Sequence, residues 1–349
     1  MRPTRDTRQL NWFLAWAVVF CDIGTSVYYV PGILYGHVKD ATPFFVLLTT
    51  GGFVLLALKY IEISWRNPEG GGVVTITTKA FGPMWGCLGG MLITVDYFLT
   101  TAISAVSGLQ YIGSVFSSLD NYIVILSCIG VGILAALNII GIRESATAAL
   151  IMASAAFVVN LIVIAAAFFT MNTEQWQTVL NHLSMGREVS SHELVVGFGA
   201  AWLAFSGLES ISQLSPAMRF PMRRTTRFAM TAVIVTIILP PPVLPPLSVG
   251  LLPDQIKATQ SERFISELGW LIGGFTLKKT AGLTASSLPF FSSNTAIFGS
   301  YHVFFSLARP GFFPRGMWRG HRAFNTPPTS VFFSPPVPPR LTLLSHGLL

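Results

Sequence analysis

The sequence has few charged residues. Only 11% of its 349 residues are Asp, Glu, Lys or Arg, whereas 52% are hydrophobic and the mean hydropathy is +0.61. Soluble domains carry about 25% charged residues. A composition this poor in charge excludes an ordinary soluble domain and predicts an all-α polytopic membrane protein.

Histidine and cysteine are also scarce, with 6 and 3 residues. The sequence contains no HExxH pair, and the glycines at 70–72 lack the Lys-Ser/Thr that a phosphate-binding loop needs. The three cysteines lie in apolar stretches without metal-ligand spacing, so we expect them to be packing residues. We therefore expect no catalytic residue, no metal and no cofactor, and a protein that is not an enzyme.

Positive charge exceeds negative charge, and the formal net charge is +7. The basic residues are scattered over short loops and are concentrated in the loops on the side of the N-terminus. The positive-inside rule explains this pattern better than nucleic-acid binding does, and it predicts a cytoplasmic N-terminus. Membrane lipid is the expected partner of the basic loop at 218–228, and no nucleic acid is expected.

Long apolar runs predict eight membrane spans, because roughly 20 apolar residues suffice to cross a bilayer. The runs cover about residues 11–35, 43–64, 85–115, 122–140, 146–169, 194–215, 229–252 and 279–307. A short segment at 73–81 is expected to be an interfacial or re-entrant piece. Four tryptophans are expected to anchor the chain at the interfaces: Trp12, Trp16, Trp85 and Trp318.

The first predicted span is interrupted near its middle. Residues 21–32 read CDIGTSVYYVPG, with an acid, two glycines, two hydroxyl residues and a proline. Non-helical backbone at membrane depth is tolerated only where it is buried in protein or lines a cavity. Discontinuous helices hold substrates and ions in secondary transporters, because their freed backbone groups face the bound charges. The structural alternative is a kinked helix with no ligand.

The sixth predicted span carries a second interruption. Residues 204–210 read AFSGLES and lie between two apolar stretches. If five spans form one repeat, the first and sixth spans occupy matching positions. Interrupted segments in matching positions of two halves indicate a transporter site.

Three acids lie at membrane depth: Asp22, Asp96 and Glu209. Such acids cost a few kcal/mol each on insertion scales and are functional candidates by default, so we expect them to be candidates for proton coupling. The alternative is that each acid is hydrogen-bonded within the bundle and only shapes it. Glu62, near the end of the second span, is expected to be a structural ion-pair partner of Lys59 or Arg66.

Taken in order, these segments resemble the amino acid–polyamine–organocation superfamily. The resemblance rests on DIGTS at 22–26, PEGGG at 68–72, Asn138 with Gly141, FSGLES at 205–210, NTA at 294–296, and AR at 308–309 with GFFP at 311–314. It covers roughly residues 10–325 and is closest to bacterial amino acid permeases. It implies one transporter domain over 1–325 in the bacterial cytoplasmic membrane.

The resemblance implies the leucine-transporter-like inverted-repeat fold of five plus five spans. The first repeat is expected at about 10–170 and a partial second repeat at about 193–325. Substrate would bind between spans one and six and move by alternating access. The implied substrate residues are Ile23, Gly24, Thr25 and Ser26 in span one, and Phe205, Ser206 and Gly207 in span six, with Phe205 a candidate gate.

The expected function is secondary active transport of an amino acid, or a related organic cation, coupled to H⁺ or Na⁺. A possible sodium site is formed by hydroxyl and amide residues of span eight: Ser292, Ser293, Asn294 and Thr295. The alternative for these residues is close helix packing. Some proton-coupled relatives place a lysine in span five, and 146–169 contains none.

Two other functions stay open. The string at 22–26 is also close to the first-span signature of bacterial potassium-uptake permeases, which are K⁺/H⁺ symporters of the same superfamily. Val27-Tyr28-Tyr29 follows it here instead of Pro-Leu-Tyr, and the GLE of span six favours amino acid permeases. A weaker alternative is a transport-inactive scaffold or sensor.

Two proline clusters conflict with membrane helices. Residues 239–246 read LPPPVLPP inside span seven, and residues 335–339 read PPVPP where a ninth span is expected. Each proline removes a backbone hydrogen bond that lipid cannot replace. We therefore expect a C-terminally truncated second repeat, with 326–349 a degraded or truncated ninth span.

Overall fold

The described part of the chain is helical. The computed structural model describes residues 10–140, 145–183, 189–308 and 311–314. Six helical stretches in it are long and apolar enough to cross a membrane: Trp12–Arg66, Pro83–Gly113, Ser117–Ala136, Ala146–Thr170, Ser191–Gln213 and Met222–Leu251. The first of them takes in two predicted spans. An all-α polytopic membrane protein is therefore confirmed, whereas the eighth span and the inverted repeat stay predictions.

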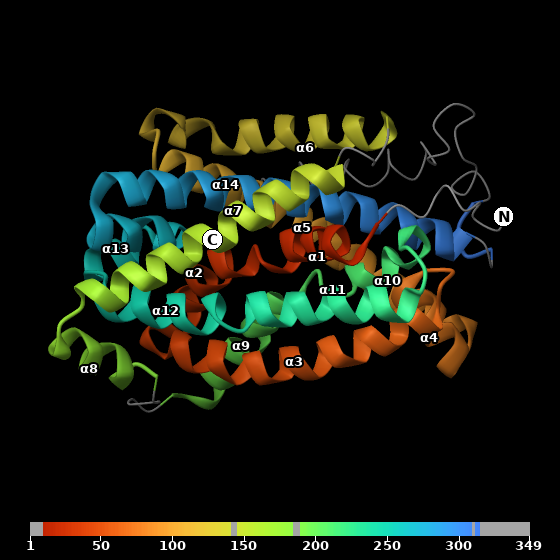
Figure 1. The fold of residues 1–349 in the computed structure, drawn as a ribbon, viewed down its shortest axis with the longest axis horizontal. Helices are drawn as coiled ribbons and strands as arrows, with labels where there is room; N and C mark the ends of the chain where they lie inside the picture. The colour runs from red at the N-terminus through yellow and green to blue at the C-terminus, as the bar shows by residue number, and fades with distance from the viewer. Residues whose placement is uncertain (1–9, 141–144, 184–188, 309–310, 315–349) are drawn as a thin grey trace.

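The first predicted span consists of two helices, α1 (Trp12–Ile23) and α2 (Ser26–Val38). The side chain of Asn11 begins α1 by accepting hydrogen bonds from two backbone N–H groups of its first turn. Helix α3 (Thr42–Arg66) runs back to the end of the bundle where α1 begins (Figure 1). The short α4 (Gly72–Phe81) lies at that end, where we expected an interfacial segment.

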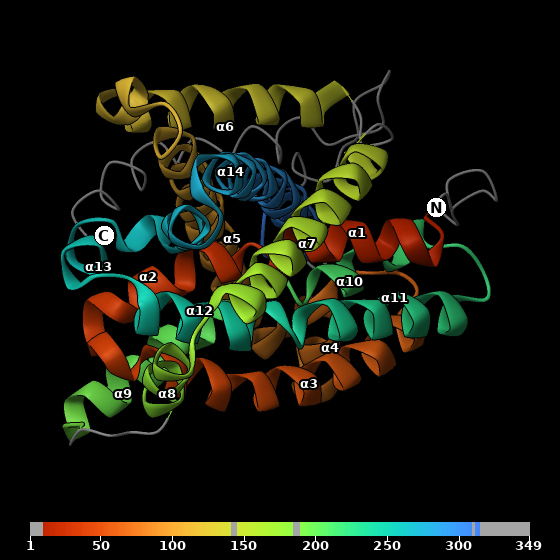
Figure 2. The same cartoon turned by 60° about the vertical axis from the view of Figure 1, so that its left-hand side comes forward.

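The middle of the chain contributes helices to the centre and the edge of the bundle. Helix α5 (Pro83–Gly113) crosses the whole bundle and is followed by α6 (Ile123–Ile140) and α7 (Ser145–Thr170). Figures 1 and 2 both place α6 at the edge of the bundle. Two shorter helices follow, α8 (Thr173–Asn181) and α9 (Ser191–Ala201).

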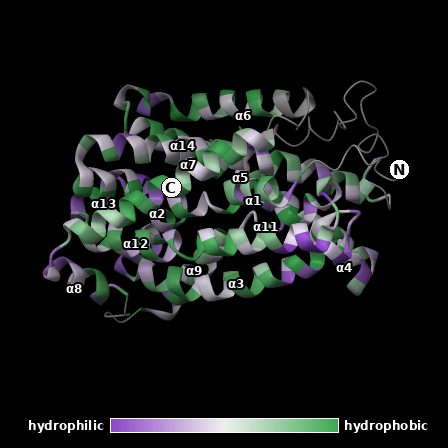
Figure 3. Cartoon of the chain, in the orientation of Figure 1, coloured by the Kyte–Doolittle hydropathy of each residue, from purple (hydrophilic) through white to green (hydrophobic). Residues whose placement is uncertain are grey.

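The last third begins with the single-turn α10 (Ser210–Gln213) and continues with α11 (Met222–Ile237) and α12 (Pro240–Leu251). Helix α13 (Asp254–Thr259) leads into α14 (Phe264–Ala308). The chain reverses its direction within α14 at Gly274, whose backbone has φ 65° and ψ −160°. Hydrophobic residues cover most of these helices, whereas hydrophilic residues gather around α4 and the start of α11 (Figure 3).

The prolines of span seven lie where a new helix begins. The helix is interrupted at 238–239, and α12 starts at Pro240. The prolines at 240–242 occupy its first turn, where the backbone N–H groups have no partner within the helix anyway. Only Pro245 and Pro246 remove helical bonds. The expected conflict is therefore confined to one turn, and the second cluster, at 335–339, lies outside the described residues, as does the predicted ninth-span segment 326–349.

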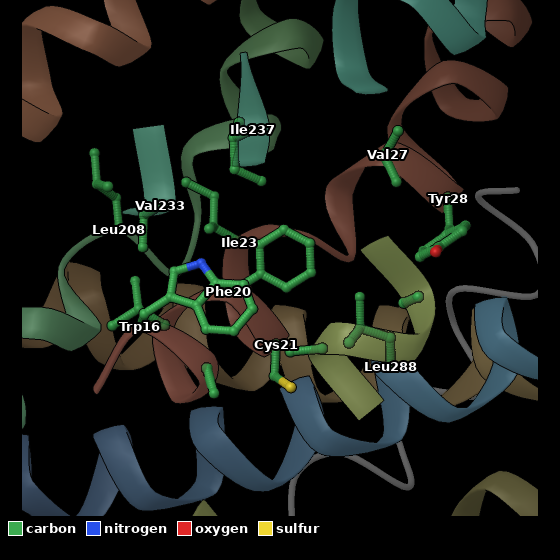
Figure 4. Packing of buried hydrophobic residues seen from close by; sticks show 14 of the residues in the cluster. Trp16, Phe20, Cys21, Ile23, Val27, Tyr28, Leu208, Val233, Ile237 and Leu288 are labelled. Atoms are coloured by element: carbon green, nitrogen blue, oxygen red, sulfur yellow. The ribbon is translucent and has the colours of Figure 1, made fainter. Parts of the chain in front are cut away.

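The core is built around α1. Figure 4 shows aromatic and aliphatic side chains of α1 and α2 packed against residues from the second half of the chain. The cluster includes Phe20, Ile23, Leu208, Val233 and Ile237, all of which are buried. Segments of the chain that are nearly 200 residues apart in sequence therefore share one core, which fixes the position of the first break.

One predicted interface residue is buried. Trp16 is 5% exposed, and its indole Nε1–H donates a hydrogen bond to Thr236 Oγ1 at 3.2 Å. The prediction was wrong because this partner on α11 satisfies the indole away from water. Trp12 and Trp85 are exposed, as expected, and Trp318 lies outside the described residues.

Both ends of the first span are tied to the second half of the chain. At the α1 end, the Leu10 N–H donates to Ala217 O at 3.0 Å, and the Arg219 N–H donates to Leu10 O at 2.9 Å. The α2 end is held by Lys257 of α13, whose side chain is only 7% exposed. Its Nζ lies 2.8 Å from Asp254 Oδ1 and 3.7 Å from Asp40 Oδ1.

Removing the lysine of this ionic tie is expected to loosen the segment around α13. We expect Lys257→Met, which keeps the apolar stem but loses the charge, to lower the thermal unfolding midpoint and to speed hydrogen exchange severalfold in residues 253–263. Lys279→Met is the matched control, because Lys279 is exposed and lies outside the tie. Equal exchange in the two variants would contradict a stabilising role for Lys257.

The ion pair between Lys257 and Asp254 predicts that the stability of the fold depends on pH in acid. The hydrogen bond from Lys257, and then its charge, lower the pKa of Asp254 below the ordinary value of 3.8. A carboxyl with a depressed pKa stabilises the fold above its ordinary pKa and loses that contribution as the pH falls through its folded value. The effect of Asp254→Asn on unfolding should therefore be constant at neutral pH and shrink only below pH 3.8.

Candidate functional site

The first break lies between α1 and α2 and is closed by two hydroxyl groups. Helix α1 ends at Ile23, and Gly24 and Thr25 form a turn before α2. Thr25 Oγ1 donates to Asp22 O at 2.6 Å, and Ser26 Oγ donates to Ile23 O at 2.7 Å. All of these residues are buried. Side chains of the predicted string thus partner carbonyls of the interrupted helix.

The second break separates α9 from α10. A 3-10 turn at Trp202–Phe205 is followed by irregular backbone at 206–209, with Gly207 at φ 99°. A Cβ atom at Gly207 would lie 2.6 Å from Asp22 Cγ and 2.9 Å from Ile23 N. The two breaks are therefore in direct contact, and only glycine fits at the point where they meet.

Asp22 joins three of the predicted spans. Its side chain is 1% exposed, and it accepts hydrogen bonds from Ser210 Oγ of α10 and, at 3.1 Å, from Ser292 Oγ of α14. Ser104 of α5 donates to Ser292 Oγ at 3.3 Å, and Thr25 Oγ1 lies 3.5 Å from the same atom. Asp22 is thus the centre of a buried network of hydroxyl groups.

Asp96 reaches the second break from α5. Ser206 Oγ donates to Asp96 Oδ2 at 3.0 Å and lies 2.7 Å from Thr100 Oγ1. Ser206 itself is buried. A residue predicted to bind substrate therefore already serves as a hydrogen-bond partner of a predicted coupling acid.

Glu209 lies in the second break between these two networks. It is 4% exposed, and its Oε1 has no hydrogen-bond partner among the described residues. The hydroxyl group of Tyr97 on α5 is also buried and faces this carboxyl group. One turn further along, both side-chain polar atoms of Gln213 are buried and have no hydrogen-bond partner among the described residues. The second break thus ends in buried polar atoms that have no hydrogen-bond partner among the described residues.

No basic side chain of the described residues forms an ion pair with any of the three acids. The ion pairs of the described chain lie elsewhere. Three buried acids that share one site without a basic partner among the described residues can be neutralised either by protons or by a bound cation. The described His, Cys, Asp and Glu side chains include no group of three or more that could hold a metal ion.

The residues predicted for a sodium site are divided. Ser292 reaches the first break, as described above. Ser293 Oγ donates instead to Thr101 O at 3.1 Å, and Thr295 Oγ1 donates to Phe291 O at 3.1 Å. The structure therefore brings Ser292 to Asp22 and commits the hydroxyl groups of Ser293 and Thr295 to helix carbonyls.

The predicted gate packs on a neighbouring helix. The ring of Phe205 is stacked on Phe53 of α3, with centroids 6.3 Å apart, and contacts Trp202 at 4.5 Å. A gating role of Phe205 stays a prediction. Glu62 pairs with Arg66 at 2.7 Å, which confirms the structural ion pair that the sequence indicated.

Sequence reasoning missed three hydroxyl groups of the site: Ser210, Thr100 and Ser104. A signal for two of them was available. Positions 96, 100 and 104 are spaced by four residues, which places Asp96, Thr100 and Ser104 on one face of a helix. A polar face with an acid, in an otherwise apolar span, indicates that this face is turned to the protein interior.

The fold and the site define an integral membrane protein in which two interrupted helices meet at buried acids. Residues 10–334 match the family described as amino acid permease. The chain therefore belongs to the amino acid permease family, within the amino acid–polyamine–organocation superfamily of transporters.

The chain is also similar to a curated transporter. The chain is 27% identical, over 265 residues, to the potassium transporter KimA of Bacillus subtilis (strain 168). The alignment covers 74% of this chain but only 43% of the relative. The chain therefore spans less than half the length of the curated relative that it matches.

Proposed function

We propose that this chain carries the binding site of a secondary transporter for a monovalent cation of the potassium class. The observation that carries the proposal is the contact of the two breaks at Asp22, surrounded by hydroxyl groups and by two further acids that have no basic partner among the described residues. The similarity to a potassium transporter supports the same choice. The geometry thus favours what the sequence analysis held as the alternative to amino acid transport.

The space at the breaks supports an ion rather than an amino acid. Because an added Cβ at Gly207 would lie 2.6 Å from Asp22 Cγ, the two segments leave little room for a molecule at their contact. A dehydrated alkali ion needs only oxygen atoms around it, and hydroxyl, carbonyl and carboxylate oxygens are supplied by Thr25, Ser292 and Asp22.

Charge supports the same choice. An amino acid carries both an ammonium group, which Asp22, Asp96 and Glu209 would attract, and a carboxylate, which they would repel where no described basic group compensates. A cation neutralises part of that charge. Glu209 is the candidate for proton coupling, since one of its oxygens has no hydrogen-bond donor among the described residues and is open to a proton.

Amino acid transport is the second candidate, favoured by the family match over residues 10–334. In that case the backbone around Gly24 would bind the substrate carboxylate, as the resemblance implies. In either case we propose that the protein acts in the bacterial cytoplasmic membrane with its N-terminus in the cytoplasm, and that it is not an enzyme.

Competition binding separates the two candidates. Radioactive rubidium, a potassium analogue, is bound to the purified full chain in nanodiscs and measured by scintillation proximity. We expect unlabelled K⁺ to displace it and a mixture of amino acids to leave it in place. Binding of labelled amino acids without any rubidium binding would overturn the proposal in favour of the second candidate. Uptake into proteoliposomes, with and without an inward proton gradient, then tests the coupling.

A further inference from the structure

A basic cavity lies at the end of the bundle where α1 and α11 begin. It has a volume of about 700 Å³, and its lining consists of Pro221, Arg223, Arg224, Arg227, Phe228 and Thr231. Three guanidinium groups on the first two turns of α11 therefore surround one opening. Figure 3 shows hydrophilic residues gathered at this end of α11.

These arginines have no carboxylate partner within the described chain. The lining includes no acid, and the described ion pairs leave out all three arginines. Two of them lie over aromatic rings instead: Arg223 is 5.3 Å from the ring of Trp65, and Arg224 is 5.5 Å from that of Phe228. Stacking on rings fixes the planar guanidinium groups and leaves their N–H donors available.

The position of the arginines is electrostatically unfavourable for the helix that carries them. The N-terminus of a helix is its positive pole, so cations in the first turns of α11 are repelled by the helix dipole. Arginine pairs with phosphate through two parallel N–H donors, and an anion placed here would relieve the repulsion between the arginines and the dipole. The cluster is therefore suited to an anion with several acceptor oxygens.

Exposed aromatic side chains place the cavity at the depth of lipid headgroups. Phe228 lines the cavity, and its ring lies 6.2 Å from that of Trp12. Phe220, just before the helix, is 68% exposed. Exposed aromatic rings on membrane proteins gather at the interface between hydrocarbon and headgroups. A lipid phosphate at this interface would therefore lie at the depth of the cavity.

We propose that the cavity between Arg223, Arg224 and Arg227 binds the phosphate of an anionic phospholipid. The aromatic rings of Phe228 and Trp12 would contact the start of its acyl chains. This inference does not depend on the proposed transport function. Because Trp65 belongs to α3 and Trp12 to α1, the bound lipid would bring together the ends of three helices.

The test measures lipid retention by native mass spectrometry and thermal stability on adding phosphatidylglycerol. We expect the wild-type chain to retain phosphatidylglycerol and to be stabilised by it but not by phosphatidylcholine. Replacing all three cavity arginines with glutamine should weaken phosphatidylglycerol binding roughly a hundredfold. Arg219→Gln is the matched control, because Arg219 lies in the same basic segment but not in the cavity, and it should bind as the wild type does.

A second variant separates lipid binding from membrane topology. Replacing the same three arginines with lysine keeps the positive charge that sets orientation, but loses the bidentate contacts, and should still weaken binding about tenfold. If the glutamine triple variant does not fold, Arg227→Gln alone should show a partial loss. Unchanged phosphatidylglycerol binding in the lysine and single variants would overturn the proposal, as would equal stabilisation by free inorganic phosphate, which would indicate a soluble ligand.

Discussion

Asp22→Asn is expected to abolish rubidium binding while leaving the protein folded. Asparagine has the same shape, and its side-chain amide can still hydrogen-bond with the hydroxyl groups of Ser210 and Ser292, so the contact between the breaks is retained. What is lost is the negative charge. At about 4 Å and an effective dielectric constant of about 20, one charge pair is worth about 4 kcal/mol, or roughly a thousandfold in affinity.

The measurement is scintillation-proximity binding of rubidium, with thermal unfolding of the same sample as a check on folding. Glu174→Gln is the matched control, since it removes the same charge from an exposed position on α8. It should bind rubidium as the wild type does. A folded Asp22→Asn protein that binds rubidium with unchanged affinity would show that the proposed cation site is wrong.

Gly207→Ala is expected to separate the two breaks. The backbone at Gly207 has φ 99°, which costs a residue with a side chain about 1–3 kcal/mol. The added Cβ would in addition lie 2.6 Å from Asp22 Cγ, so one of the two segments must move. We expect a lower unfolding midpoint together with a loss of rubidium binding similar to that of Asp22→Asn.

Another glycine of the same span provides the control. Gly199 lies on α9, is exposed, and has nothing within 4 Å of an added Cβ. Gly199→Ala should stabilise the helix by about 0.5–1 kcal/mol and leave binding unchanged. If Gly207→Ala has the same unfolding midpoint and the same rubidium affinity as the wild type, the tight contact between the breaks has no functional role.

The sequence predicts the helices and both interruptions because their signals are local. An apolar run of about 20 residues predicts a span, and an acid with glycine and hydroxyl residues in its middle predicts an interruption. Helices α5 and α7 begin and end within two residues of the predicted spans for the same reason, and α1 begins within one residue of the first predicted span. The three acids were recognisable because a charge at membrane depth needs a special environment.

The partners within the site were not predictable in this way. Ser210 and Ser292 lie 188 and 270 residues from Asp22 in sequence. A serine in a membrane helix is equally well explained by close packing, so its type does not indicate which acid it reaches. The prediction that Trp16 lies at the interface was wrong for the same reason, since its partner Thr236 is also distant along the chain.

The contacts that hold the two ends of the first span are of different types. The two ends of the bundle should therefore respond differently to dissolved salt. At Leu10 the fastening is made of two backbone hydrogen bonds, which dissolved salt does not screen. At Lys257 the contact is ionic, because its ammonium group lies 3.7 Å from the half-exposed carboxylate of Asp40 just after α2, where dissolved ions compete. Concentrated salt should therefore loosen the α2 end of the rod formed by α1 and α2, and leave its α1 end closed. A concentrated salt solution would thus favour opening of the bundle at the α2 end only.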